Sequence, residues 1–134
     1  MADISRSESA VADLWQLKTK KHPFRAAVDI EAGQPLYIDA NGNVNKADAN
    51  ASAPANTYVG IAMQTVNKGQ SVDAAEEGDF AGFDLSGLAY FAPVYVSNTA
   101  GELADAAGTA TLLVGRVYPA PDSENTKILH LTRV

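Results

Sequence analysis

The chain has 134 residues and no cysteine, and its 16 acidic and 10 basic side chains give a formal net charge of −6. This length suits one compact domain with a core. The lack of cysteine excludes disulfides and thiolate metal sites, and the acidic balance argues against nucleic-acid binding, which needs clustered Lys and Arg. Because no signal peptide or membrane-spanning apolar stretch is evident, we expect a soluble protein made in the cytoplasm.

The first 25 residues differ in charge from the rest. Residues 1–25 carry five basic and three acidic side chains, a net charge of +2, whereas residues 26–134 carry five and thirteen, a net charge of −8. The apolar spacing from Ser7 to Leu17 favours a short helix that Pro23 ends, and an extended arm is the alternative. We predict an N-terminal arm over 1–25 that docks on an acidic surface, and a single β domain over 26–134.

After the arm, the pattern predicts strands and tight turns. Leu36 and Ile38 alternate with Tyr37 and Asp39, as in a half-buried strand. The Asn41-Gly42 pair that follows is typical of a hairpin turn. Further strands are expected in YVGIAMQTV (58–66), SVDAA (71–75), LAYFAPVYVS (88–97), TLLVGRVYPA (111–120) and KILHLTRV (127–134).

A diverged duplication is the most informative feature. PLYIDANGNV (35–44) and PVYVSNTAGEL (93–103) share a proline, an aliphatic residue, a tyrosine, a β-branched residue and a polar turn with glycine. An Ala-rich loop follows each, and then come YVGIA (58–62) and LVGRV (113–117). The glycine after valine lets a strand bend or approach a neighbouring backbone closely. We predict an all-β fold, a small β-sandwich or partly closed β-barrel built from two diverged β repeats, with chance similarity of two hairpins as the alternative.

Few residues offer chemistry. His22 and His130 have no carboxylate or second histidine at ligand spacing, so we expect no metal site. No serine lies in a nucleophile motif, and no glycine run forms a phosphate loop. An acidic turn is expected at 76–79, with Asp84 nearby, and a solvated turn or a charge partner for a neighbouring subunit is favoured over a cation site. We predict no catalytic residue, no cofactor and no enzyme activity.

An ordered set of short segments resembles the small capsid cement (decoration) proteins of tailed bacteriophages. The segments are AGQPLYID (32–39), NGNVNKADA (41–49), VGIA (59–62), GQSV (69–72), PVYVS (93–97), TAGELA (99–104) and LVGRV (113–117). The resemblance implies an all-β protein on the outer surface of the virion capsid, made in the host cytoplasm and frequently a homotrimer. It also implies binding to the major capsid protein and stabilisation of the capsid lattice, and it carries over no catalytic residue.

The arm departs from the family, whose members begin with a polar, Gly/Thr-rich lead. Here the lead is charged and contains the only tryptophan. We expect the arm to reach the major capsid protein or an adjacent subunit, with an apolar anchor and lysines that meet acidic groups. The predicted capsid or subunit interface consists of Trp15, Leu17, Lys18, Lys20, Lys21, Phe24 and Arg25. No nucleic acid and no membrane is expected as a partner.

Two other functions remain open from the sequence. One is a structural module elsewhere in the virion, such as a tail-tube, head-fibre or connector component. The other is a carbohydrate-binding β-sandwich, in which tyrosines stack on sugars. The tyrosines considered are Tyr37, Tyr58, Tyr90 and Tyr95, for which packing between strands is the favoured interpretation.

Overall fold

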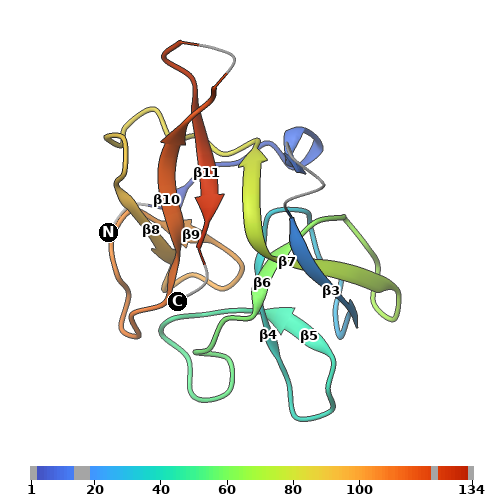
Figure 1. The fold of residues 1–134 in the computed structure, drawn as a ribbon. Coiled ribbons are helices and arrows are strands. Elements are labelled where there is room, and N and C mark those ends of the chain that lie inside the picture. The colour runs from blue at the N-terminus through green and yellow to red at the C-terminus, as the bar shows by residue number, and fades with distance from the viewer. Residues whose placement is uncertain (1–2, 14–18, 122–123, 133–134) are drawn as a thin grey trace.

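The computed structural model describes residues 3–13, 19–121 and 124–132. In this part of the chain the protein is all-β, with an 11-stranded antiparallel sheet that curls into a half-barrel (Figure 1). The elements are β1 (Asp3–Ile4), the short 3-10 helix η1 (Glu8–Ala10), β2 (Ala12–Asp13), β3 (Lys20–Arg25), β4 (Pro35–Ile38), β5 (Val44–Lys46), β6 (Gly60–Ala62), β7 (Ser71–Ala81), β8 (Pro93–Val96), β9 (Leu103–Ala104), β10 (Leu113–Pro119) and β11 (Lys127–Leu131). The predicted fold class is confirmed.

The predicted duplication is confirmed in the order of the strands. Along the sheet, β9-β8-β10-β11 is followed by β7-β6-β4-β5, so two units of four strands meet at their last strands. Their registers agree as well. Leu36 lies opposite Gly60 in the first unit, and Val94 lies opposite Gly115 in the second. Because β7 and β11 are antiparallel, an approximate two-fold axis relates the units.

The two repeated glycines have the same steric role. A Cβ atom on Gly60 would lie 2.7 Å from the carbonyl oxygen of Ala75, and one on Gly115 would lie closer still to the carbonyl oxygen of His130. Ala75 and His130 hold equivalent positions on β7 and β11, because each lies opposite the residue that follows the glycine, Ile61 in the first unit and Arg116 in the second. The close approach of backbones anticipated from the sequence is therefore present in both units.

Strand β7 joins the two parts of the sheet. Its first part pairs with β3 and β6, and its last part pairs with β2 and β11. It changes direction at Gly78, whose φ of +143° is a conformation that L side chains rarely adopt. The acidic turn expected at 76–79 is thus wrong, because these residues lie inside β7. Pairing on both sides of the strand, including His130 opposite Asp79, outweighs the low strand propensity of its acidic residues.

The core has two clusters and contains many alanines, and the larger cluster takes residues from both units. The larger cluster includes Phe80, Val94, Leu103, Val117 and Leu129, and the smaller one includes Ile30, Leu36, Val44 and Val72. Each such buried side chain contributes about 1.5–3 kcal/mol through the hydrophobic effect. Alanines at the centre of the sheet, among them Ala62, Ala74 and Ala75, keep its layers close together.

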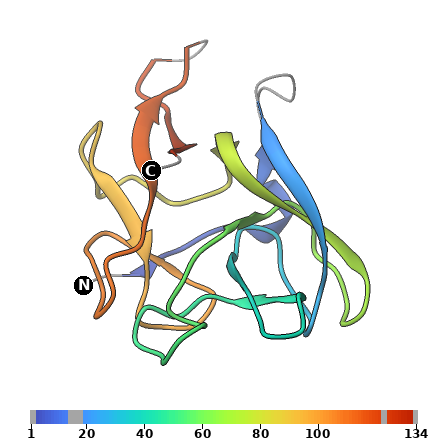
Figure 2. The same ribbon diagram turned by 60° about the horizontal axis from the view of Figure 1, so that its bottom comes forward.

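The described part of the first 25 residues belongs to the same sheet. Strand β1 pairs with β9, and β2 and β3 pair with β7, so this segment adds strands to both units. Figure 2 shows β3 running beside β7 on one side of the half-barrel, opposite β8 and β10. Residues 3–13 and 19–25 form short strands and their connections, apart from the 3-10 turn of η1. The predicted helix or extended arm also includes residues 14–18, which lie outside the described residues, so the choice between the two stays a prediction.

The buried guanidinium of Arg6 links the two units. Its Nη2 atom lies 3.1 Å from a carboxylate oxygen of Glu31, which precedes β4, and its Nη1 atom lies 2.9 Å from one of Glu102, which precedes β9. Its Nε donates a hydrogen bond to the carbonyl of Ala32 at 3.2 Å. The Arg6 side chain is only 7% exposed, so this residue is a structural clasp between the repeats.

Candidate interaction surfaces

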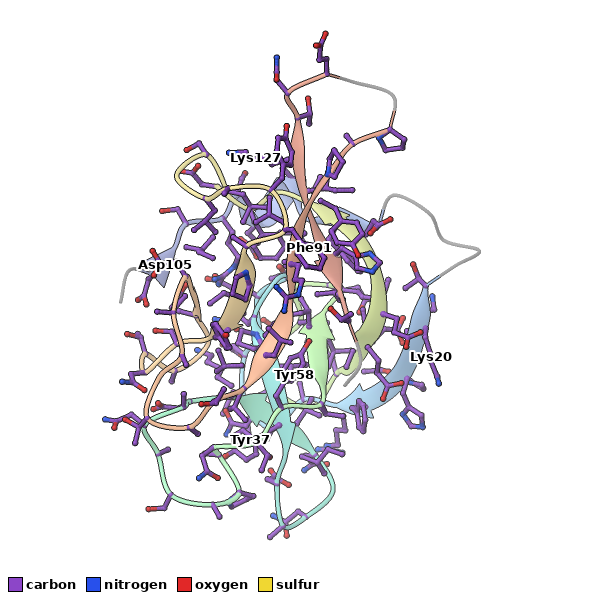
Figure 3. All side chains as sticks on the ribbon, turned by 60° about the vertical axis from the view of Figure 1, so that its left-hand side comes forward. Lys20, Tyr37, Tyr58, Phe91, Asp105 and Lys127 are labelled. Carbon is purple, nitrogen blue, oxygen red and sulfur yellow. The ribbon has the colours of Figure 1, made fainter. Side chains whose placement is uncertain are left out.

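Strand β3 is the basic part of the predicted interface. Of the predicted residues, Lys20, Lys21, Phe24 and Arg25 lie on this strand, whereas Trp15, Leu17 and Lys18 lie outside the described residues. Among the described strands, β3 pairs with β7 alone, so it forms an edge. The side chains of Lys20, Lys21, His22 and Arg25 are exposed. The strand therefore presents basic groups to solvent from a backbone that the sheet holds in place, as Lys20 does in Figure 3.

Phe24 and Lys21 have roles within the fold as well. Phe24 is half-buried and packs against the smaller core cluster, with its ring centroid 4.7 Å from that of His22. The Nζ atom of Lys21 lies 3.9 Å from a carboxylate oxygen of Asp73 on β7. Phe24 thus anchors the strand, and Lys20 and Arg25 are the charges most directly offered to a partner.

A second surface is formed by the β10–β11 hairpin and the loop before β8. It combines aromatic and charged side chains from β7, β10, β11 and the loop before β8. We call it the aromatic–charged patch, and it consists of Asp79, Tyr90, Phe91, Arg116, Tyr118, Lys127 and His130. In Figure 3, Phe91 lies against the hairpin and Lys127 lies closer to its tip, well apart from Lys20 on β3. The patch is therefore separate from the predicted interface.

A polar row crosses the patch. Arg116, His130 and Asp79 are direct cross-strand neighbours on β10, β11 and β7. The Nδ1 atom of His130 lies 2.5 Å from a carboxylate oxygen of Asp79, and since a carboxylate only accepts, Nδ1 is the donor. The ring of Tyr118 stacks on His130 with centroids 4.1 Å apart. The sequence did not connect His130 with a carboxylate, because Asp79 lies 51 residues away.

Among the described residues, the large exposed aromatic side chains are Tyr90 and Phe91, and both lie in the loop between β7 and β8. A strand was expected over 88–97, but β8 begins only at Pro93, and Phe91 has a left-handed φ of +66°. The backbone N–H of Phe91 donates to the carbonyl of Val117 at 2.6 Å, and its own carbonyl accepts from Arg116 Nη1 at 3.0 Å. The strand prediction for 88–92 is wrong because the loop instead docks by its backbone on β10.

The start of this loop is held by an acidic side chain. The Asp84 carboxylate accepts hydrogen bonds from the hydroxyl of Ser86 at 2.7 Å and from its backbone N–H at 3.2 Å. These bonds, the hydroxyl first, stabilise the charged form and hold the pKa of Asp84 below its usual 3.8. The Nζ atom of Lys127 donates to the carbonyl of Leu88 at 2.5 Å. The loop is therefore held to the hairpin at Leu88 by Lys127 and at Phe91 by Val117.

A groove of about 510 Å³ lies where the two units meet. It is lined by equivalent segments, the starts of β6 and β10, together with side chains from β7 and beyond β11. The lining residues are Thr57, Tyr58, Val59, Glu76, Thr111, Leu112, Leu113 and Thr132. Tyr58, labelled in Figure 3, packs against the larger core cluster, in keeping with its interpretation as a packing residue. Among the described lining residues, Glu76 carries the one carboxyl group.

The described residues contain no group of three or more His, Asp or Glu side chains placed to hold a metal ion. In the same part of the chain, no helix has the length and apolar character that crossing a membrane requires. Comparisons with known proteins give no relative, since no protein-family model, no curated protein and no solved structure matches the chain significantly. The surfaces and the sequence motifs are therefore the features that indicate a function.

Proposed function

We propose that this chain is a non-enzymatic structural protein of a virion, which binds the outer surface of a tailed-phage capsid and stabilises its lattice. The observation that carries the proposal is the exposed basic edge strand β3 on a chain with a net charge of −6. Such a charge separation suits docking on an acidic partner surface, here the major capsid protein. Lys20 and Arg25 supply the principal charges of this contact.

The ordered motifs that resemble capsid cement proteins support the same function. They fall largely on the duplicated strands β4 to β6 and β8 to β10, which form the body that carries β3. A decoration protein needs surface area and not an active site, and stable interfaces bury about 1,200–2,000 Å². Self-association as a homotrimer would join several β3 strands in one particle, so that weak individual contacts add through avidity.

Co-sedimentation with expanded, undecorated heads tests this function. The unmodified protein is expected to bind saturably, at a fixed number of copies per head, and binding is expected to weaken as salt screens the charges. Lys20→Gln and Arg25→Gln should each weaken binding several-fold. The matched control is Lys46→Gln, which removes a lysine of β5 whose side chain lies against Gly101 and not on β3, and it should leave binding unchanged.

The outcomes separate clearly when folding is verified by circular dichroism. Equal binding by all three variants would show that β3 is not part of the interface. Absence of binding by the unmodified protein would overturn the proposed function. A deletion of residues 2–22 is a poor test, because it would remove Arg6 and part of β3 and so disturb the sheet itself.

A further inference from the structure

We propose that the aromatic–charged patch is a docking surface for an acidic polypeptide segment, in which carboxylates stand beside apolar side chains. This inference goes beyond the proposed function, because it requires neither a phage capsid nor strand β3. The proposed docking surface is formed by the β10–β11 hairpin and the loop before β8.

Exposure is the first argument. Phe91 is 60% exposed and Tyr90 is 45% exposed, and among the described residues the other large exposed apolar side chain is Ile38, at 41%. Two neighbouring aromatic rings left in water are unfavourable for an isolated protein and are typical of interface anchors. They are also preorganised, because the loop is fixed by backbone hydrogen bonds to β10, so little conformational entropy is lost on binding.

Backbone conformation is the second argument. A bulky L residue at a φ of +66° is strained, and glycine would adopt the same conformation without strain. Phe91 does not offset this strain by burying its ring, since the ring is largely in solvent. Strain of this kind is found where a side chain must be held in one place for function. A phenylalanine at position 91 therefore exposes an aromatic ring to solvent at a cost to the stability of the loop.

Charge is the third argument. The guanidinium of Arg116 lies 4.5 Å from the centroid of the Phe91 ring, and the Nζ atom of Lys127 lies 5.4 Å from that of Tyr90. These cations are two of the five basic residues that follow Arg25. Two carboxylates lie close by: Asp79 accepts a hydrogen bond from His130, and Asp84, which lines a pocket with Lys127, accepts hydrogen bonds from Ser86. Each exposed ring thus has a cation beside it, which suits an apolar side chain flanked by a carboxylate.

The arrangement of the rings favours a polypeptide over a sugar. Sugar recognition uses an open aromatic face together with polar groups that bond the hydroxyls. Here Arg116 lies over a face of Phe91, and the ring of Tyr118 stacks on His130. Interactions within the patch therefore occupy ring faces that a sugar would use. The ring edges and the flanking cations remain for a protein partner.

The test is a chemical-shift titration of the full chain with three probes. These are a short synthetic peptide of alternating Asp and Leu, the same peptide with Lys in place of Asp, and a soluble glucose oligosaccharide. The Asp-Leu peptide is expected to shift resonances of Phe91, Arg116, Tyr118 and Lys127. Phe91→Gly should weaken its binding about tenfold or more while raising the melting temperature, because the ring is lost and the strain is relieved. Arg116→Gln should weaken binding as well, and Ile38→Ser, the control for an exposed apolar side chain, should leave it unchanged.

Several results would overturn the inference. Equal shifts with the Lys-Leu peptide would remove the role of the cations, and shifts with the oligosaccharide alone would assign the patch to sugars. Shifts confined to β3, or unchanged binding by Phe91→Gly and Arg116→Gln, would show that the patch is not the docking surface. Binding to capsids by Phe91→Gly is a separate measurement, so the proposed function stands or falls independently of these outcomes.

Discussion

At the scale of single residues, the clearest structural assignment is the clasp formed by Arg6. One guanidinium reaches two carboxylates, Glu31 just before the first repeat and Glu102 within the second. The Arg6 side chain is buried, but Glu31 is 56% exposed and Glu102 is 32% exposed, so water screens the ion pair with Glu31 more than the ion pair with Glu102. The clasp therefore fixes the two units relative to each other as well as adding stability.

We predict that Arg6→Ala lowers the free energy of unfolding by about 2–3 kcal/mol, because it removes charge-assisted hydrogen bonds of about 1.5–3 kcal/mol each that are not additive. Glu31→Gln should cost less than about 1 kcal/mol, since the Glu31 side chain is 56% exposed and Glu102 still pairs with Arg6. Urea denaturation of both variants measures the difference. Equal, small losses would show that the clasp contributes little.

At the scale of elements, the repeated glycines explain why β6 and β10 approach the next strand so closely. Gly60 and Gly115 face backbone carbonyls of β7 and β11, which cannot move aside as the end of a flexible side chain can. The geometry of each four-strand unit thus depends on one position without a Cβ atom. The duplication is visible in the sequence largely because this requirement persists in both copies.

Gly60→Ala is expected to lower the free energy of unfolding by about 2 kcal/mol, and Gly115→Ala by about 3 kcal/mol or more, because the new methyl group forces the strands apart. Gly87→Ala is the matched control, since a Cβ atom there meets nothing within 4 Å, and it should change stability by less than about 0.5 kcal/mol. Thermal or urea unfolding ranks the three variants. The reverse order at Gly60 and Gly115 would contradict the steric explanation.

At the scale of the whole molecule, the two units close on each other through their loops. The backbone N–H of Ala49 donates to the carbonyl of Ser97, and that of Gly101 donates to the carbonyl of Ala47, both at 3.0 Å. The far ends of the curled sheet are thereby joined. Strand β3 and the aromatic–charged patch lie on different parts of the half-barrel, so the two proposed contacts do not overlap.

We expect the protein to form a homotrimer, as the proposed decoration function implies. Sedimentation equilibrium should give a mass three times that of the chain over a range of protein concentrations. Phe91→Gly should leave this mass unchanged if the patch serves an acidic segment of another protein, as proposed. A shift of Phe91→Gly to monomers would instead assign the patch to contacts between copies.

Much of the fold was accessible from the sequence because its signals are local. The Asn41-Gly42 hairpin prediction holds, since β4 and β5 flank this turn and Gly42 has a positive φ of +81°. The all-β class and the two repeats also follow from short patterns of proline, tyrosine and glycine. The acidic turn expected at 76–79 and the strand expected at 88–92 are wrong, because contacts with distant strands outweigh local propensity. Of the strand expected over 58–66, only β6 at 60–62 is present.

The sequence alone determined the fold class, the two-unit plan and the position of the basic segment, because periodicity, turn residues and charge are properties of neighbouring residues. Only the tertiary structure decided which distant groups meet. It placed Arg6 between Glu31 and Glu102, and it brought Phe91 and Arg116 together on one face. The physical reason is that cross-strand contacts are set by register and by the curl of the sheet, which depend on packing of the whole molecule.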